Sequence, residues 1–294
     1  MKSMKRIPGP FLVFLGAFCL SFGGLIVKSF DHANLWQILF WRQVFFSIIV
    51  ALYLLLIYKK KFFNSFYNLG VPGFLAGFVL ALGFSSYVFS MYETTIANTN
   101  FIISTETIFL AIFGFFFLKE KINLITFISI FFGMLGVLLI VGSSISIQTK
   151  QEFTGNIVAF IMPISFAILV VIIRKYPNID MVPAQFVAGV CSSMIGYLVA
   201  KDLSISNPDL FLSAVAGFFQ VGLGFILITL GSKSTASAVV GVLMLSETVL
   251  GPLWAWLFIN EIPPLTVIIG GIIIIFSILL QSSVGMVSFM IAKK

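Results

Sequence analysis

Charged residues are scarce in this chain: Asp, Glu, Lys and Arg make up 9% of its 294 residues, against 60% hydrophobic residues. A soluble domain carries about 25% charged residues, because its surface must face water. Seven stretches contain no charged residue at all: 7–27, 62–92, 122–149, 153–173, 181–200, 210–232 and 262–292. Since about 20 apolar residues cross the hydrocarbon core of a bilayer, this pattern predicts a polytopic membrane protein.

Cysteine and histidine are also rare. Cys19 and Cys191 both lie in apolar segments, and we expect them to be packing residues. A disulfide framework would need paired cysteines in exposed loops. His32 is the single histidine, and no metal-ligand spacing is present, so we expect neither a metal nor a cofactor. The sequence also lacks a nucleotide-binding P-loop and a nucleophile beside a base. We therefore expect neither an ATP-driven pump nor an enzyme.

Run length and the positions of charges and prolines predict an all-α protein with ten transmembrane helices. Barrel strands would alternate polar and apolar residues, and no such alternation occurs. The first apolar run continues past Gly24 without a clear cleavage site, and it is interpreted as an uncleaved first span rather than a signal peptide. The predicted helices are 10–30, 34–58, 70–92, 95–118, 122–142, 155–174, 182–200, 209–231, 235–258 and 264–288.

The basic residues predict the orientation of these helices. With a cytoplasmic N-terminus, 13 of the 17 Lys and Arg residues fall on the inner side, and only Lys28, Lys150 and Lys201 fall in outer loops. Because short cytoplasmic loops are enriched in Lys and Arg, both termini are predicted to be cytoplasmic. The net charge of +7 is thereby attributed to topology and contact with anionic lipid, and not to nucleic-acid binding.

The dipeptide Glu-Thr occurs twice in apolar surroundings, and the two copies belong to a longer repeat. Five pairs of identical residues are each 141 positions apart: Glu106 and Glu247, Thr107 and Thr248, Glu120 and Glu261, Phe117 and Phe258, and Ala97 and Ala238. The chain thus divides into two five-helix halves, 1–148 and 149–294. Because five is odd, the second half enters the membrane from the opposite side. Such inverted repeats are typical of secondary transporters, which bind substrate near the midplane between the halves.

A family resemblance rests on the fourth and ninth predicted helices, which end in the similar runs FGFFFLKEKINLITF and LWAWLFINEIPPLTV. With ten spans in two halves, the chain resembles the EamA branch of the drug/metabolite transporter superfamily over nearly its whole length. The resemblance implies a bundle around a central cavity that moves small metabolites, often amino acids, across a bacterial inner membrane. Glu106 departs from the pattern, since many relatives carry an uncharged residue or Pro there, so the resemblance assigns it no role.

Three charged residues are predicted to lie near mid-membrane: Glu106, Glu247 and Arg42. Each Glu is about 11 residues, or roughly 16 Å, from the outer end of its predicted helix. A charge at that depth costs about 2.5–3.5 kcal/mol and so faces the protein interior or a water-filled cavity. Two hypotheses remain open. Arg42 pairs with a Glu and locks two helices together, or the three groups line the pathway and meet a polar substrate or a proton.

Helical periodicity adds further candidates. Thr99 and Phe113 share one stripe of the fourth helix with Glu106, with Asn98 at its flank, and Trp254 shares the matching stripe of the ninth helix with Glu247. A carboxylate beside an aromatic ring suits an ammonium group, and the planar guanidinium of Arg42 suits a carboxylate. Together they predict a zwitterion such as an amino acid. The competing interpretation is that both aromatic rings only pack.

Other polar residues inside the predicted spans each need a partner or cavity water. Gln43, Gln185 and Gln220 are second-tier site candidates. Glu120 and Glu261 are expected to be turn residues that meet the N-terminal dipole of the next helix. Pro163 and Pro252 are expected to kink or loosen their helices.

The sequence leaves two functions open. The first is a secondary transporter for a small polar or zwitterionic metabolite, with export favoured by the family resemblance. The alternative is a proton-coupled efflux carrier for lipophilic cations, with Glu106 or Glu247 as the exchangeable site. Ten helices can enclose a pathway alone, so a monomer suffices physically, and a homodimer is also compatible. Small molecules and membrane lipid are the expected partners.

Overall fold

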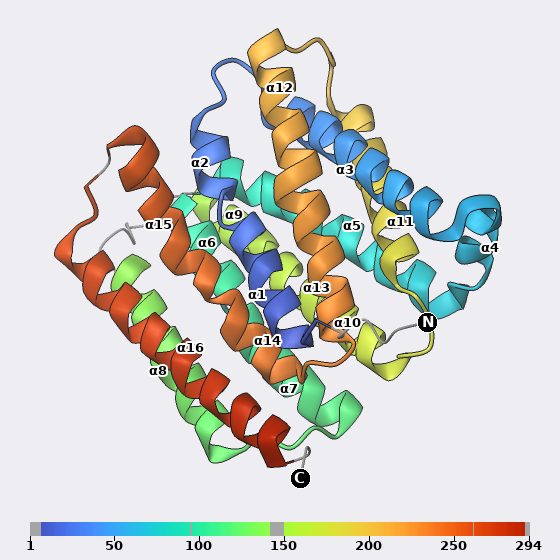
Figure 1. The fold of residues 1–294 in the computed structure, drawn as a ribbon. Coiled ribbons are helices and arrows are strands. Elements are labelled where there is room, and N and C mark those ends of the chain that lie inside the picture. Colours follow the sequence, from blue (N-terminus) through green and yellow to red (C-terminus); the bar gives the residue numbers. More distant parts are fainter. Residues whose placement is uncertain (1–6, 95, 142–149, 261, 292–294) are drawn as a thin grey trace.

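The computed structural model describes residues 7–94, 96–141, 150–260 and 262–291, and in these ranges the chain forms helices and turns without a β strand (Figure 1). The helices of the first half are α1 (Gly9–Leu20), α2 (Gly23–Lys28), α3 (Leu35–Tyr58), a 3-10 turn (Lys59–Lys61), α4 (Phe62–Tyr67), α5 (Gly70–Glu93), α6 (Ile96–Ser104), α7 (Glu106–Leu118) and α8 (Leu124–Val141). Those of the second half are α9 (Lys150–Ala159), α10 (Ile161–Lys175), α11 (Val182–Val199), α12 (Asn207–Val215), a π-helix (Ala216–Leu223), α13 (Gly224–Ser232), α14 (Ser237–Met244), α15 (Ser246–Ile259) and α16 (Leu265–Ile291).

These helices assemble into membrane spans that confirm the predicted all-α polytopic fold. Within the described residues, nine continuous or briefly interrupted helical spans are long and apolar enough to cross a bilayer, and a tenth, 124–140, is apolar but shorter. Predicted and observed ends agree within three residues, except that α9 begins at Lys150 rather than at 155. Lys150 is exposed and lies within the helix, so the charge there does not prevent helix formation.

Polar side chains fix where several helices begin. Asn34 accepts hydrogen bonds from the backbone N–H groups of Trp36 and Gln37, and the Gln37 side chain accepts one from the N–H of Asn34. This capping box satisfies backbone donors that the first turn of α3 would otherwise leave unpaired. Asn123 caps α8 by accepting from the N–H of Thr126 at 2.7 Å.

The packing of the helices is consistent with two inverted halves. The first span packs on the eighth through α1 and α13, and the third span packs on the sixth through α5 and α10. These two contacts are equivalent when the halves are exchanged. Three other contacts join equivalent spans of the two halves: α3 with α11, α7 with α14, and α8 with α16. In Figure 1 the α8–α16 pair (green and red) lies along one edge of the bundle, and α3 and α11 lie on the other side. The equivalent pairs are thus arranged as an inverted repeat requires.

Small residues allow the spans to approach closely. At the α8–α16 contact, a Cβ on Gly136 would lie 2.7 Å from the carbonyl oxygen of Gly270, and a Cβ on Gly270 would lie 2.6 Å from that of Gly136. In lipid, where burial between helices gains little over burial in acyl chains, such backbone approach is a main source of helix association. The two glycines therefore define this contact.

Four spans are interrupted near the middle of the bundle. The breaks lie at Ser21 and Phe22 between α1 and α2, at Thr105 between α6 and α7, at Phe160 between α9 and α10, and at Leu245 between α14 and α15. Pro163 explains the third break, because a proline ring collides with the carbonyl four residues earlier, here that of Ala159. Pro252 was also expected to kink or loosen its helix, and α15 continues through this residue without a break.

A polar network joins the two halves at one end of the bundle. Glu120, after α7, forms an ion pair with Arg174 near the end of α10 and accepts a hydrogen bond from the N–H of Ser237, the first residue of α14, at 2.8 Å. Arg174 also donates to the carbonyl oxygens of Ser232 and Thr235. Glu120 lies in the turn between α7 and α8, as predicted, but its hydrogen bond and ion pair go to the second half, whereas Asn123 caps α8. Glu261 lies outside the described residues.

Candidate functional site

The two broken spans that carry the repeated Glu-Thr pairs cross at their breaks. The hydroxyl of Thr107 in α7 donates to the carbonyl oxygen of Gly241 in α14 at 3.0 Å, and the hydroxyls of Thr248 and Ser104 lie 3.2 Å apart. A Cβ on Gly241 would lie 2.7 Å from the Cα of Thr107, so the two backbones touch. The crossing joins equivalent elements of the two halves and fixes the position of the residues on either side of it.

The hydroxyls of Thr105 and Ser246, which are 141 positions apart, each form a hydrogen bond within their own span. Thr105 donates to the carbonyl oxygen of Ile102 at 2.5 Å, and Ser246 donates to that of Leu243 at 2.7 Å. Such bonds compete with the regular helical hydrogen bonds and bend helices. They accompany the breaks that both spans have just before their acidic residues.

Glu106 and Glu247 consequently stand in the first turns of α7 and α15. A carboxylate is stabilised there by the exposed N–H groups and by the positive end of the helix dipole. Glu106 is 5% exposed and Glu247 is half-buried. Within the described part of the chain, neither carboxylate forms an ion pair or a hydrogen bond. Both are therefore available to a mobile partner.

Arg42 lies in α3 and is 5% exposed. Its Nε and Nη2 atoms have no hydrogen-bond partner among the described residues, and its guanidinium carbon lies 5.4 Å from the centre of the Tyr87 ring. A cation over an aromatic face gains about 0.5–2 kcal/mol, which offsets only part of the cost of a buried charge. The hypothesis that Arg42 is locked to a Glu is not supported, since no such ion pair is present in the described chain.

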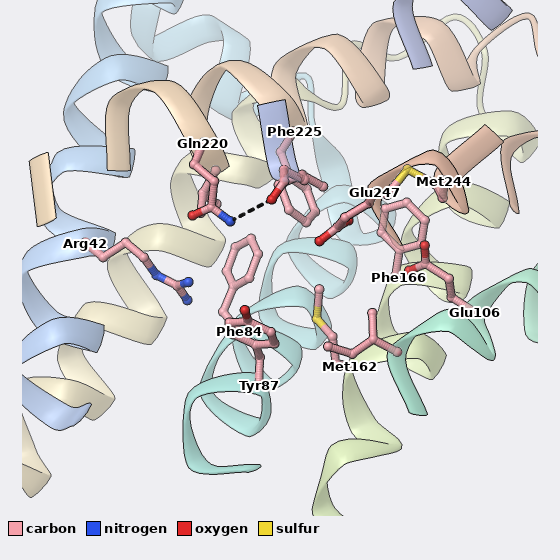
Figure 2. A pocket seen from close by; sticks show the side chains of 13 residues that line it. Arg42, Phe84, Tyr87, Glu106, Met162, Phe166, Gln220, Phe225, Met244 and Glu247 are labelled. Carbon is pink, nitrogen blue, oxygen red and sulfur yellow. Dashed lines mark hydrogen bonds between the residues drawn. The ribbon is translucent and has the colours of Figure 1, made fainter. Parts of the chain in front are cut away.

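One pocket contains all three charged residues (Figure 2). It has an empty volume of about 470 Å³, and its thirteen lining residues come from seven of the ten spans and from both halves. Its polar lining residues are Arg42, Tyr87, Glu106, Gln220 and Glu247. Small-molecule sites are usually concave and mostly apolar, with a few polar groups directed inward. The pocket has this character.

The pocket is internally symmetric. Glu106 and Glu247 are 141 positions apart, and two further lining pairs have the same spacing: Phe84 with Phe225, and Ile103 with Met244. The two Phe rings meet edge to face, with centroids 4.9 Å apart. The two halves therefore contribute equivalent residues to part of the pocket.

Gln220 reaches the pocket from an irregular part of its span. It lies in the π-helix between α12 and α13, and its Nε2 atom donates to the carbonyl oxygen of Leu20 at 3.3 Å. Leu20 is the last residue of α1, directly before the break in the first span. π-helical turns are often found at functional sites, and here the widened turn carries the only amide side chain that lines the pocket.

The remaining predicted site residues do not line this pocket. Trp254 donates through Nε1 to the Ser21 hydroxyl and stacks on Phe22, with ring centroids 4.6 Å apart. Phe113 packs between Phe109 and Phe117. The aromatic rings beside the acids are thus different ones from those predicted.

The polar candidates outside the pocket have local surroundings of their own. Thr99 shares a hydrogen bond with Ser90, and Asn98 donates to Thr94. Gln185 donates to Thr229 at 2.6 Å. Gln43 is fully buried in α3, and neither its Nε2 nor its Oε1 atom has a partner among the described residues.

Sequence reasoning missed the aromatic walls of the pocket. Tyr87, Phe84, Phe166 and Phe225 were not singled out, because 46 aromatic residues in the chain leave every helix face with several candidates. The 141-residue spacing would have identified Phe84 and Phe225. No signal in the sequence marks Tyr87 or Phe166. Among the described residues, no group of three His, Cys, Asp or Glu side chains could hold a metal.

A bundle of apolar spans in two inverted halves, with a pocket between them that contains polar groups, is an arrangement typical of membrane transporters. The family model for EamA-like transporters matches residues 7–142 and again residues 153–283. The chain belongs to the EamA-like transporter family, as the resemblance implied.

Individual relatives agree with this assignment. An uncharacterized transporter of Methanothermobacter thermautotrophicus is 26% identical over 182 residues, which are 58% of this chain and 51% of that protein. The chain thus spans about half the length of this relative. An uncharacterized transporter of Clostridium kluyveri is 24% identical over 75% of this chain and 73% of its own length. A crystal structure, described only as that of a protein, has a TM-score of 0.79 at 14% identity, over 93% of this chain and 98% of its own, which shows the fold.

Proposed function

We propose that this EamA-like transporter exports a small amino-acid-like zwitterion across the bacterial inner membrane by alternating access. One observation carries the proposal: Arg42 is buried and unpaired in the same pocket as two unpaired carboxylates. The planar guanidinium is suited to hold a substrate carboxylate by two parallel hydrogen bonds. A carboxylate from either Glu106 or Glu247 is suited to hold the substrate ammonium.

The position of the pocket supports alternating access. Its walls come from both halves, and the two halves meet at the Thr107–Gly241 and Ser104–Thr248 contacts. Rocking of one half against the other would expose the same residues to either side in turn, as in other inverted-repeat transporters. The two halves of one chain surround the pocket, and a single copy is proposed to form the pathway. Both termini are proposed to be cytoplasmic.

The second candidate is proton-coupled efflux of lipophilic cations. It is favoured by the two acids and by the rings of Phe84, Phe166 and Phe225 in the same pocket. Arg42 argues against it, because an unpaired guanidinium repels a cation that has no anionic group. The zwitterion is therefore the better match to the full set of charges.

Counterflow in proteoliposomes tests the proposal. Vesicles containing the purified protein are loaded with a mixed amino-acid pool, and uptake of labelled amino acids is followed. Arg42→Gln is expected to raise the half-saturating concentration at least about thirtyfold, because removing one partner of a buried charge pair costs about 2–5 kcal/mol. Glu247→Gln is expected to lower uptake in the same range.

Glu93→Gln supplies the matched control, since Glu93 ends α5 and does not line the pocket. This variant is expected to transport like the unmodified protein. If Arg42→Gln and Glu247→Gln both leave the uptake of every zwitterion unchanged, the site is assigned to the wrong residues. If a lipophilic cation such as tetraphenylphosphonium exchanges for protons and Arg42→Gln leaves that exchange intact, the second candidate is correct.

A further inference from the structure

The charged side chains of the pocket do not balance, because two are negative and one is positive. If the pocket binds a zwitterion, the proposed function on which this inference rests, the imbalance narrows the class of zwitterion that fits. The lining contains two carboxylates, Glu106 and Glu247, and one guanidinium, Arg42. None of the other ten lining residues is Asp, Glu, Lys, Arg or His. A simple zwitterion neutralises Arg42 and one carboxylate and leaves the second carboxylate without a partner.

An unpaired ionised group is costly at this depth. A charge at mid-membrane costs about 2.5–3.5 kcal/mol even on the lenient insertion scale, and enclosing it with an occupant that offers no partner removes the water that would solvate it. The favoured occupant therefore supplies a positive group to each carboxylate and a negative group to Arg42. It carries two ammonium groups and one carboxylate.

The order of the side chains agrees with such a molecule. In Figure 2, Arg42 lies at one side of the pocket, Glu106 at the other, and Glu247 between them. The sequence of charges is thus positive, negative, negative along the pocket. An amino acid with a terminal amine presents the complementary sequence of carboxylate, α-ammonium and distal ammonium.

The wall beside Glu106 suits the methylene chain that would separate the two ammonium groups. Met162, Met244 and Phe166 line the pocket there. Methionine side chains are flexible and fill irregular space around an aliphatic chain. The walls near Arg42 are more polar, with Gln220 and Tyr87.

We infer that the pocket binds α-amino acids that carry a second, side-chain ammonium group, with Glu106 as the residue that selects the distal charge. Glu247 and Arg42 hold the α-ammonium and the carboxylate, which every amino acid has. Glu106 thereby determines specificity, whereas the other two determine whether any amino acid binds.

Competition assays in proteoliposomes test the inference with probes that differ by one group. Lysine is compared with norleucine, which has the same chain length but no distal ammonium, and with cadaverine, which has no carboxylate. Lysine is expected to compete at concentrations at least about thirtyfold lower than either, the factor for one lost partner of a buried charge pair. Glu106→Gln is expected to remove the advantage of lysine over norleucine, because lysine then competes at concentrations at least about thirtyfold higher than with the unmodified protein.

Elution of the Glu106→Gln protein as a single peak in detergent shows that it is folded, and Glu93→Gln again serves as the control that changes neither probe. If norleucine competes as well as lysine, or if Glu106→Gln weakens both equally, the inference is overturned while the proposed function stands. If norleucine moves together with one proton and Glu106→Gln abolishes the proton movement, a proton takes the place of the second ammonium and the inference is again wrong. If no amino acid is transported, the proposed function itself fails.

Discussion

At the scale of single residues, Arg42 shows how this pocket keeps a charge without neutralising it. The guanidinium packs over the Tyr87 ring at 5.4 Å, and two of its nitrogens remain without a hydrogen-bond partner in the described chain. A ring face attracts a cation but leaves its N–H donors free. Tyr87 therefore positions Arg42 while leaving it able to bind an anion.

Substitution of Tyr87 separates these two contributions. Tyr87→Phe keeps the ring and is expected to change the half-saturating substrate concentration less than about threefold. Tyr87→Ala removes the cation–π contact of about 0.5–2 kcal/mol and is expected to raise that concentration by about 3- to 30-fold. Counterflow at increasing substrate concentration measures both. Equal effects of Phe and Ala would show that the hydroxyl, and not the ring, supports Arg42.

The sequence predicted some of these residues because a charge within an apolar span is conspicuous. Glu106, Glu247, Arg42 and Gln220 were identified in this way, and all four line the pocket. Trp254 was misplaced because the break in the first span, which the sequence does not reveal, brings the Ser21 hydroxyl to its indole N–H. An aromatic residue in a Phe-rich helix finds its partner through tertiary packing, and periodicity alone does not determine that partner.

At the scale of elements, the broken spans decide where the acids lie. The ends of the helices followed from charges and caps, and they were predicted closely. The breaks were harder to predict, since only Pro163 gave a strong signal. The breaks at Thr105 and Leu245 are accompanied by hydroxyl bonds of Thr105 and Ser246, which many regular helices also tolerate.

The α7–α14 crossing is expected to tolerate no added side chain at Gly241. A Cβ there would lie 2.7 Å from the backbone of Thr107, which has little freedom to move. Gly241→Ala is therefore expected to destabilise the protein by about 1–3 kcal/mol, as overpacking does. Thermal unfolding in detergent measures the change as a lower midpoint.

Gly24→Ala is the matched control. Gly24 lies in α2, and no atom lies within 4 Å of the position that its Cβ would take. Because Ala favours helix over Gly by up to about 1 kcal/mol, this variant is expected to unfold at the same temperature or slightly higher. Similar losses for both variants would show that the crossing is not closely packed.

At the scale of the whole molecule, the inverted repeat was predictable because the 141-residue spacing is present in the sequence itself. The pairing of spans across the halves was not predictable from that spacing. It depends on which glycines meet, such as Gly136 with Gly270. The repeat also fixes the two halves in opposite orientations, so the direction of the whole bundle depends on the basic residues of its loops.

Labelling of single cysteines tests that direction. In a variant in which Cys19 and Cys191 are replaced by Ala, Lys60→Cys and Lys201→Cys place one thiol in exposed positions at opposite ends of the bundle. A membrane-impermeant maleimide is expected to label Lys201→Cys in intact cells and to label Lys60→Cys only after the cells are broken, because Lys-rich loops remain cytoplasmic. The reverse pattern would place both termini outside.

Glu120 belongs to the first half, and its partners Arg174 and Ser237 belong to the second. One carboxylate thus joins the two halves at one end of the molecule. It forms an ion pair with Arg174 and accepts a hydrogen bond from the first residue of α14. Rocking of the halves apart at this end, as the proposed alternating access requires, would break these bonds and remake them in each cycle.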